Sequence, residues 1–317
     1  MVIGADAAGM SAAHQALRTA GSRGVDIEVV VLERTRDTSY SACGIPYLVA
    51  GLVDSTDDLT ARSAEQHRAM GVDLRMGTTA VGIDLDRRTV TIDSVETGSG
   101  TIGFDQLVLA TGAEPVVPPW AVDADGSPVP GVRAVKTLDD ARYWLDTVVG
   151  HRGATRRAVV VGGGYVGLEM AEAALGRGYQ TTLITRTRLM SNLDPEMSER
   201  IEQGVRDAGV TLVTGSVVES LEIGAADVKT LHTHDGQEFD ADLVMLGIGV
   251  TPSVRLGVQA GLPVGEYGGY RTDDHQRLAD GVWAAGDCCE VYDRVRGANA
   301  FLPLGTHANK QGRVCGY

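Results

Sequence analysis

The sequence lacks the features that mark several classes of protein. In its 317 residues no apolar run approaches the ~18 residues of a membrane span, and no positively charged leader precedes an apolar signal core. Lys and Arg number 28 against 42 Asp and Glu, giving a net charge of −14. This balance argues against nucleic-acid or anionic-membrane partners, which are held mainly by cationic side chains. The simplest interpretation is a soluble cytoplasmic protein that binds any anionic ligand locally.

Cysteine is scarce, and its spacing excludes two kinds of site. The four cysteines contain no Cys-x-x-Cys pair, no zinc-ligand spacing and none of the density of a secreted disulfide scaffold, so no metal is expected. Cys288, Cys289 and Cys315 are expected to be reduced and buried or half-buried. Cys43 stands apart because it lies in "TSYSACGIPYLVAG", after small and hydroxylated residues and before a glycine and a proline.

A repeat carries the fold prediction. The segments "VIGADAAGMSAAHQALRTAG" and "VVVGGGYVGLEMAEAALGRG" each read as a β run, a glycine turn and an amphipathic helix, and a second apolar run follows each. Further on, "GVDLRMGTTAVGIDLD…FDQLVLATGA" matches "GVTLVTGSVVESLEI…FDADLVMLGIG", which is typical of an antiparallel meander followed by a buried strand. The sequence therefore predicts an α/β fold with two Rossmann-like dinucleotide-binding lobes, three-layered and each with a small antiparallel β meander.

The domain boundaries follow from composition. The Pro/Gly-rich segment "GAEPVVPPWAVDADGSPVPGVRAV" marks the crossing between lobes. We expect residues 1–113 to form the first lobe, 114–247 the second, and 248–317 to return to the first. From Glu33 to Gly71 is 38 positions, against 24 from the equivalent Thr185 to Gly209. Cys43 lies in that extra length, which is a reasonable place for chemistry that the other lobe does not share.

The second lobe carries a dinucleotide-binding pattern, Gly162-x-Gly164-x-x-Gly167, between a β run and a helix. The first glycine permits a tight turn, the second lets a pyrophosphate approach the backbone, and the third lets helix and strand pack closely. The pyrophosphate would lie at the helix N-terminus, where N–H groups point outward.

The first lobe departs from this pattern, because it reads Gly4-x-Asp6-x-x-Gly9. The acid is unfavourable near a phosphate unless its side chain turns away. Glu33, at the end of the second strand, supports a nucleotide site because a carboxylate there can accept both hydroxyls of an adenosine ribose.

The matching position of the second lobe is Thr185, followed by Arg186 and Arg188. An acid there would repel a 2′-phosphate, whereas a hydroxyl and two guanidinium groups would bind it. The pattern favours NADPH over NADH.

Five segments in order, "GADAAGMSAA", "SYSACGIPYLVAG", "FDQLVLATGA", "GGGYVGLEMAEA" and "VWAAGD", resemble the FAD-dependent pyridine nucleotide-disulfide oxidoreductases. The resemblance is nearest to their single-cysteine branch of coenzyme A-disulfide reductases, NADH oxidases and NADH peroxidases. It implies FAD in the first lobe, at Gly4, Ala8, Gly9, Glu33, Ala110, Thr111, Gly112 and, on the ribityl chain, Asp287. It implies a nicotinamide cofactor in the second lobe, at Gly162, Gly164, Val166, Gly167, Glu169, Thr185, Arg186 and Arg188.

The resemblance also implies substrate contacts at Ser11, Gln15, Arg18, Ser39 and Ala42. Ser11, Gln15 and Arg18 fall on one face of the first helix, where Arg18 could bind coenzyme A phosphates, although a solvated polar face is the alternative. Coenzyme A-disulfide reductases usually have an asparagine in place of Ala42, so the identity of the disulfide stays open. Oxidases and peroxidases have a histidine in place of Ala7, which favours a disulfide over oxygen or peroxide.

The expected mechanism is a relay of electrons from NAD(P)H through FAD to Cys43, which reduces a small-molecule disulfide such as coenzyme A disulfide. Pro46 indicates a helix start just after Cys43, and a helix N-terminus stabilises a thiolate. Because no second cysteine is near in sequence, the oxidised state should be a mixed disulfide, a persulfide or a sulfenic acid.

Two alternatives remain open. The same cysteine could serve an NAD(P)H oxidase or a polysulfide/persulfide reductase, or the chain could be an electron-transfer flavoprotein reductase acting on a protein partner. Members of the family continue into a third domain that pairs two subunits. We therefore expect this chain to lack a C-terminal dimerisation domain and a full-length form to be a homodimer.

Overall fold

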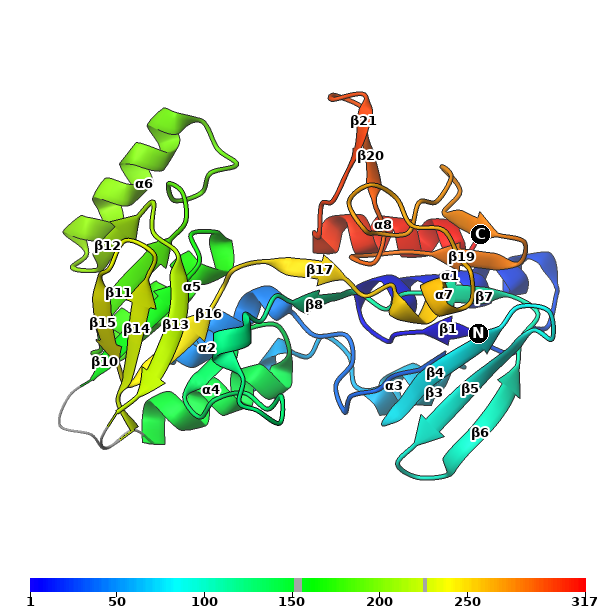
Figure 1. The fold of residues 1–317 in the computed structure, drawn as a ribbon. Helices are drawn as coiled ribbons and strands as arrows, with labels where there is room; N and C mark the ends of the chain where they lie inside the picture. The colour runs from blue at the N-terminus through cyan, green and yellow to red at the C-terminus, as the bar shows by residue number, and fades with distance from the viewer. Residues whose placement is uncertain (151–155, 225–226) are drawn as a thin grey trace. The chain divides into compact units, whose positions relative to one another are not determined.

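The computed structural model describes residues 1–150, 156–224 and 227–317 (Figure 1). The chain divides into two compact units. The first comprises Met1–Tyr40, Thr60–Glu114 and Thr251–Tyr317, and the second comprises Ser41–Leu59 and Pro115–Val250. The segment Ser41–Leu59, expected in the first lobe, thus clusters with the second unit.

The first unit is built on a six-stranded sheet. In spatial order its strands are β18 (Arg277–Ala279), β19 (Val282–Ala284), β7 (Leu107–Leu109), β1 (Val2–Ile3), β2 (Val30–Leu32) and β3 (Asp73–Arg75). All neighbours pair in parallel except β18 with β19. The carboxyl ends of β19, β7, β1 and β2 therefore lie along one edge of the sheet.

Two layers cover this sheet. Helices α1 (Ala7–Arg23) and α8 (Gly305–Cys315) pack against each other, and Met10 and Ala13 of α1 bury Val2, Val31 and Val108 of the sheet. The other face packs against an antiparallel meander, visible at the lower right of Figure 1. Its strands are β4 (Thr78–Asp84), β5 (Thr89–Ser94) and β6 (Gly98–Gly103).

The second unit repeats the plan with a five-stranded, all-parallel sheet. In spatial order its strands are β12 (Thr211–Thr214), β11 (Gln180–Thr185), β10 (Arg157–Val161), β16 (Leu243–Leu246) and β9 (Val132–Ala134). Its meander, packed on one face of the sheet, consists of β13 (Val218–Ile223), β14 (Lys229–Thr233) and β15 (Glu238–Ala241). The predicted fold, two Rossmann-like lobes each with an antiparallel meander, is confirmed.

Helices complete the second unit. They are α2 (Ile45–Ala50), α4 (Leu138–Gly150), α5 (Tyr165–Gly176) and α6 (Pro195–Asp207). Helix α2 packs against α4 and α5, and its residues Ile45, Leu48 and Val49 are buried. This apolar contact explains why the segment Ser41–Leu59 clusters with the second unit rather than with the lobe on either side of it in sequence.

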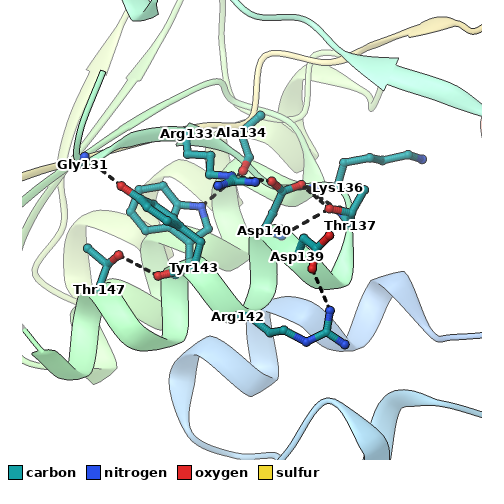
Figure 2. A network of polar contacts seen from close by, with 11 residues as sticks. Gly131, Arg133, Ala134, Lys136, Thr137, Asp139, Asp140, Arg142, Tyr143 and Thr147 are labelled. Carbon is teal, nitrogen blue, oxygen red and sulfur yellow. Dashed lines mark hydrogen bonds and ion pairs between the residues drawn. The ribbon is translucent and has the colours of Figure 1, made fainter. Parts of the chain in front are cut away.

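A polar network fixes the start of α4 (Figure 2). The buried Asp140 carboxylate accepts hydrogen bonds from Arg133 Nε at 2.6 Å and from the backbone and hydroxyl of Thr137, both at 2.9 Å. The Arg133 guanidinium lies over the Tyr143 ring, 4.9 Å from its centroid. Because every buried polar group in it is paired, this network is a structural anchor for the helix.

The remaining elements are short. They are η1 (Ala42–Gly44), η2 (Asp57–Leu59), α3 (Ala64–Ala69), β8 (Ala113–Pro115), η3 (Pro119–Ala121), β17 (Val250–Pro252), α7 (Arg255–Gln259), β20 (Val291–Asp293) and β21 (Ala298–Ala300). Among the described residues, no helix is both long enough and apolar enough to cross a membrane.

Candidate functional site

The glycine turn of the first unit joins β1 to α1 and leaves no room for side chains. Gly4 has φ +103°, and a Cβ there would collide with the Ala110 carbonyl oxygen. A Cβ at Gly9 would collide with the Gly4 carbonyl oxygen. Glycine at both positions thus lets the start of α1 approach the ends of β1 and β7, which is the geometry of a pyrophosphate-binding turn.

Glu33, directly after β2, reaches back to this turn. Its Oε2 accepts the N–H of Ala5 at 2.8 Å, and its Oε1 accepts the N–H of Thr35 at 2.8 Å. A carboxylate oxygen has two lone pairs, so Oε2 can accept one further donor such as a ribose hydroxyl. With part of its capacity used to hold the turn, Glu33 has less to offer a ribose than the sequence alone indicates.

The ends of β7 and β19 complete this edge of the first unit. Ala110, Thr111 and Gly112 follow β7 and are half-buried, and the Thr111 hydroxyl donates to the Ser253 carbonyl at 2.6 Å. After β19, Gly286 has φ +87°, and a Cβ there would lie 2.9 Å from Ala8 Cβ.

The loop after β19 is tied to α8. The Gly286 N–H donates to Gln311 Oε1 at 2.8 Å, and half-buried Asp287 comes next. The groups at this edge that could contact a ligand are the N–H groups of a tight glycine turn and helix start, the acid Glu33 after β2 and the acid Asp287 after β19. This combination fits the diphosphate, ribose and polyol portions of FAD.

The expected substrate residues of α1 do not form one free polar face. Ser11 Oγ donates to Asn309 Oδ1 of α8 at 2.9 Å. Gln15 is buried, and its Oε1 accepts a hydrogen bond from Arg18 Nη2 at 2.8 Å. Arg18 is exposed, so it is the member of the three best able to meet an anionic ligand.

Ser39 belongs to a chain of polar contacts that the sequence did not reveal. Its Oγ lies 2.8 Å from His67 Nε2, and His67 Nδ1 lies 2.8 Å from His14 Nε2. Both histidines are buried. Since 53 positions separate them in sequence, no local spacing could have indicated the pair.

The glycine turn of the second unit has the same construction. Gly162 has φ +124°, and a Cβ there would collide with the Gly247 carbonyl oxygen, while a Cβ at Gly167 would collide with the Gly162 carbonyl oxygen. Gly164, in contrast, has no described atom within 4 Å of an added Cβ. The open side at Gly164 is where a pyrophosphate could approach the backbone at the start of α5.

The two arginines that follow β11, both expected to bind a 2′-phosphate, differ in their contacts. Arg186 is exposed. Arg188 donates to Ser198 Oγ at 3.2 Å and to the carbonyls of Ser191 at 3.3 Å and Leu193 at 3.0 Å, so it holds the loop before α6. Thr185 is only 5% exposed. Of the two arginines expected to act together, Arg186 is therefore the cation available to a ligand, whereas Arg188 has a structural role in the loop.

Two further residues of α5 were expected at the nicotinamide cofactor. Val166 is exposed and Glu169 is half-buried. Burial, reinforced by the charge of Glu172, raises the pKa of Glu169 above its ordinary value. A carboxyl group of this kind, one turn into the helix from a pyrophosphate-binding turn, is suited to a polar contact with an uncharged ring amide.

Cys43 lies in the short turn η1, directly before α2, and is exposed together with Ala42. The carboxyl end of α2 is held by Arg177 from the end of α5, whose Nε donates to the Val49 carbonyl at 2.7 Å. Helix α2, which follows Cys43, is thus anchored at its carboxyl end by a charge-assisted hydrogen bond and along its length by its buried side chains.

The other three cysteines are free thiols of a different kind. Cys288 and Cys289 are buried and Cys315 is half-buried, which confirms the expectation from sequence. Their sulfur contacts include Cys288 Sγ 3.8 Å from Cys289 Sγ. Burial raises the pKa of Cys315 to about 12 and contributes to the raised pKa of Cys289, where the neighbouring Cys288 is the larger cause. Cys289 and Cys315 are therefore not suited to be thiolate nucleophiles.

Comparison with known proteins gives a consistent result. A family model described as pyridine nucleotide-disulphide oxidoreductase matches residues 1–301. An NAD(P)H sulfur oxidoreductase (CoA-dependent) of Pyrococcus abyssi is 34% identical over 320 residues, covering 100% of this chain and 68% of the relative.

Two solved structures share the fold over 99% of the chain. An NAD-dependent persulfide reductase of A. fulgidus has a TM-score of 0.91 at 33% identity, with 57% of its own chain covered. An engineered NADPH oxidase derived from the water-forming NADH oxidase of Lactobacillus brevis, solved with NADPH bound, has a TM-score of 0.90 at 31% identity, with 68% covered.

Proposed function

Because the chain belongs to the pyridine nucleotide-disulphide oxidoreductase family, we propose that it takes electrons from NADPH and uses Cys43 to reduce a small disulfide such as coenzyme A disulfide. Membership makes it an NAD(P)H-dependent flavin oxidoreductase. The electron acceptor and the preference for NADPH are the proposed part.

The first unit would hold FAD. The start of α1 would present N–H groups to the pyrophosphate, Glu33 Oε2 would accept a hydrogen bond from a ribose hydroxyl, and Asp287 would bind the ribityl chain. FAD held there would supply the chemistry of hydride acceptance from a nicotinamide and electron transfer to a sulfur acceptor. The protein contributes the binding edge along the carboxyl ends of β1, β2, β7 and β19.

The observation that carries the proposal is the exposure of Cys43. Of the four cysteines, all within the described residues, it alone is exposed. Its thiolate attacks one sulfur of the disulfide, the S–S bond breaks, and the departing thiolate takes a proton while Cys43 is held in a mixed disulfide. Two electrons derived from NADPH then cleave that mixed disulfide, which restores the Cys43 thiolate and releases the second half of the substrate as a thiolate that takes up a proton.

The preference for NADPH rests on the residues after β11. The engineered oxidase that binds NADPH carries, among five substitutions, three consecutive ones: aspartate to alanine, alanine to arginine and methionine to serine. The same order of chemical types, uncharged, arginine and hydroxyl, occurs here as Thr185, Arg186 and Thr187. An uncharged residue followed by an exposed guanidinium favours a 2′-phosphate.

Polysulfide or persulfide is the second candidate acceptor. The relatives named for CoA-dependent sulfur reduction and for persulfide reduction favour it. The same Cys43 would serve, because attack on a sulfur–sulfur bond is common to both acceptors.

The test uses FAD-loaded protein with NADPH and, in separate assays, coenzyme A disulfide, polysulfide and oxygen. We expect Cys43→Ser to lower disulfide-dependent NADPH oxidation at least ~1000-fold, as loss of a nucleophile does. Reduction of ferricyanide by NADPH should be unaffected because it does not need a thiol. Cys315→Ser is the matched control and should retain both activities. Full disulfide reduction by Cys43→Ser would refute the assignment.

A further inference from the structure

The loop after β19, which carries Asp287, forms a tight turn within the first unit. The Cys289 N–H donates to the Gly286 carbonyl at 2.9 Å, so these two residues are the ends of a β-turn in which Asp287 comes second. The Cys288 carbonyl accepts the N–H of Tyr270 at 2.7 Å, which holds the far side of the turn. Because that side is held, the orientation of Gly286 determines where the Asp287 side chain can point.

The N–H of Gly286 has its partner outside the turn and outside the sheet. It donates to Oε1 of Gln311, in α8, at 2.8 Å and across 25 positions of sequence. Gly286 is buried, and Gln311 is only 8% exposed. The part of the chain that the structure describes offers this N–H no other hydrogen bond. Since a buried N–H without an acceptor is unfavourable, the Gln311 side chain determines how Gly286 is held.

Helix α8, this turn and the start of α1 are packed without space between them. A Cβ at Gly286 would lie 2.9 Å from Ala8 Cβ, and a Cβ at Gly312 would collide with the Ala8 carbonyl oxygen. Gly312 directly follows Gln311, so one turn of α8 contacts both segments. The start of α1, which would face the FAD pyrophosphate, and the turn that carries Asp287 thus meet beside Gln311.

We propose that Gln311 is a positioning residue for FAD, which holds Gly286 so that the Asp287 carboxylate faces the ribityl hydroxyls. The inference rests on the binding of FAD to the first unit in the proposed function, and it adds a residue that sets the affinity of that site. An amide suits this position because Oε1 accepts the N–H without adding negative charge beside Asp287 and an anionic diphosphate. Gln311 acts through the turn and not on the reacting atoms.

The test compares FAD with ADP, which lacks the ribityl chain and the flavin. Gln311→Met keeps the length of the side chain and removes the amide acceptor. We expect the Kd for FAD, measured by quenching of flavin fluorescence, to rise about tenfold, the range of one hydrogen bond. The Kd for ADP, measured by competition with FAD, should be unchanged because ADP does not extend to Asp287. An equal loss of affinity for both ligands would overturn the proposal, because Gln311 would then support the fold as a whole.

The matched control lies two positions earlier in α8. Asn309 Oδ1 accepts the Ser11 hydroxyl at 2.9 Å and so ties α8 to α1 without contact to the turn after β19. Asn309→Leu should lower Tm and leave the Kd for FAD and the Kd for ADP unchanged. If Asn309→Leu weakened FAD as much as Gln311→Met does, the contact between the two helices, and not the bond to Gly286, would set the affinity.

A double variant tests whether Gln311 acts through Asp287. Asp287→Asn should itself weaken FAD binding, because an amide accepts fewer ribityl hydroxyls than a carboxylate does. If the role of Gln311 is to aim that carboxylate, adding Gln311→Met to Asp287→Asn should have little further effect on the Kd for FAD. Independent effects of the two changes, or an unchanged Kd in Gln311→Met alone, would overturn the proposal.

A measurement on the unmodified protein decides the case if a variant fails to fold. The backbone amide signal of Gly286 and the side-chain amide signal of Gln311 should both shift in ¹⁵N-resolved spectra when FAD is added. ADP should leave both signals in place. Absence of a shift with FAD, or an equal shift with ADP, would overturn the inference.

These measurements need neither NADPH nor a disulfide, so they separate the inference from the proposed reaction. FAD binding that depends on Gln311, in a protein that reduces no disulfide, would leave the inference standing and refute the reaction at Cys43. Disulfide reduction with an FAD affinity that does not depend on Gln311 would do the reverse.

Discussion

The two glycine turns have the same backbone geometry and differ in the side chains around it. In both, a Cβ on the first glycine would collide with a carbonyl of a neighbouring strand end, and one on the last glycine would collide with the first glycine's carbonyl. Beyond the next strand the first unit has Glu33 and the second has Thr185. The fold therefore supplies the same glycine-turn geometry twice, and we propose that the residue after the next strand determines whether ribose hydroxyls or a phosphate can lie beside it.

The connection after that strand differs as well. In the second unit it leads through a loop held by Arg188 into α6. After β2 the chain instead passes through Ser39, Cys43 and α2 and returns at α3, which carries His67. We propose that chemistry which only one copy needs lies in this connection, where an insertion leaves the sheet unchanged.

The largest effect is expected on the free energy of unfolding in acid, through His67 in α3, where this longer connection ends. The pKa of His67 is lowered from 6.5 to about 4 in the folded protein, so the unfolded chain binds more protons between these pH values. Stability should therefore fall as pH falls through this window, by up to about 3 kcal/mol. Urea unfolding at about pH 7 and about pH 4.5 should show a smaller acid loss in His67→Gln than in the unmodified protein. An identical loss in both would contradict the prediction.

Making the first copy like the second should weaken FAD binding. Glu33→Thr removes the acceptor of the Ala5 N–H and of a ribose hydroxyl, and we expect a loss of about 2 kcal/mol, or roughly 30-fold in Kd. Quenching of flavin fluorescence measures the affinity. Glu33→Gln is the control, because it keeps one acceptor oxygen and should bind FAD with intermediate affinity. Equal affinity in all three proteins would show that Glu33 holds only the turn.

The two arginines after β11 sharpen the comparison. Arg186→Ala should raise the KM for NADPH about tenfold and leave that for NADH unchanged, because an exposed guanidinium facing a phosphate is lost. Arg188→Ala is the matched control: it should lower Tm by releasing the loop before α6, with little change in cofactor preference. The reverse pattern would mean that the loop, not Arg186, selects the cofactor.

The smallest effect is expected at the helix behind Cys43. Arg177→Ala removes the donor to the Val49 carbonyl at the end of α2 and should cost about 1 kcal/mol locally. Amide hydrogen exchange across Tyr47–Leu52 should become faster. Arg156→Ala is the control. The Arg156 guanidinium donates to the Arg177 backbone carbonyl, so this change removes a neighbouring bond and leaves the bond from Arg177 Nε to the Val49 carbonyl in place. Unchanged exchange in Arg177→Ala would show that apolar packing alone holds α2.

The sequence was sufficient for the two lobes because their signals are local. A β run, a glycine turn and an amphipathic helix are contiguous, and the steric demands on Gly4, Gly9, Gly162 and Gly167 arise within a few residues or from the adjacent strand. The buried state of Cys288 and Cys289 was predictable for a different reason, because a free cysteine without metal-ligand spacing usually behaves as a small buried side chain.

Only the tertiary structure decided which side chains were already engaged. Arg186 and Arg188 look alike in sequence and are both exposed, yet the Arg188 guanidinium is held by the Ser198 hydroxyl and two carbonyls. Ser39, His67 and His14 meet although long stretches of chain separate them. The segment Ser41–Leu59 clusters with α4 and α5 because α2 buries its apolar side chains there. Local patterns determine which elements form, whereas hydrogen bonds and burial between distant elements determine what each polar side chain is free to do.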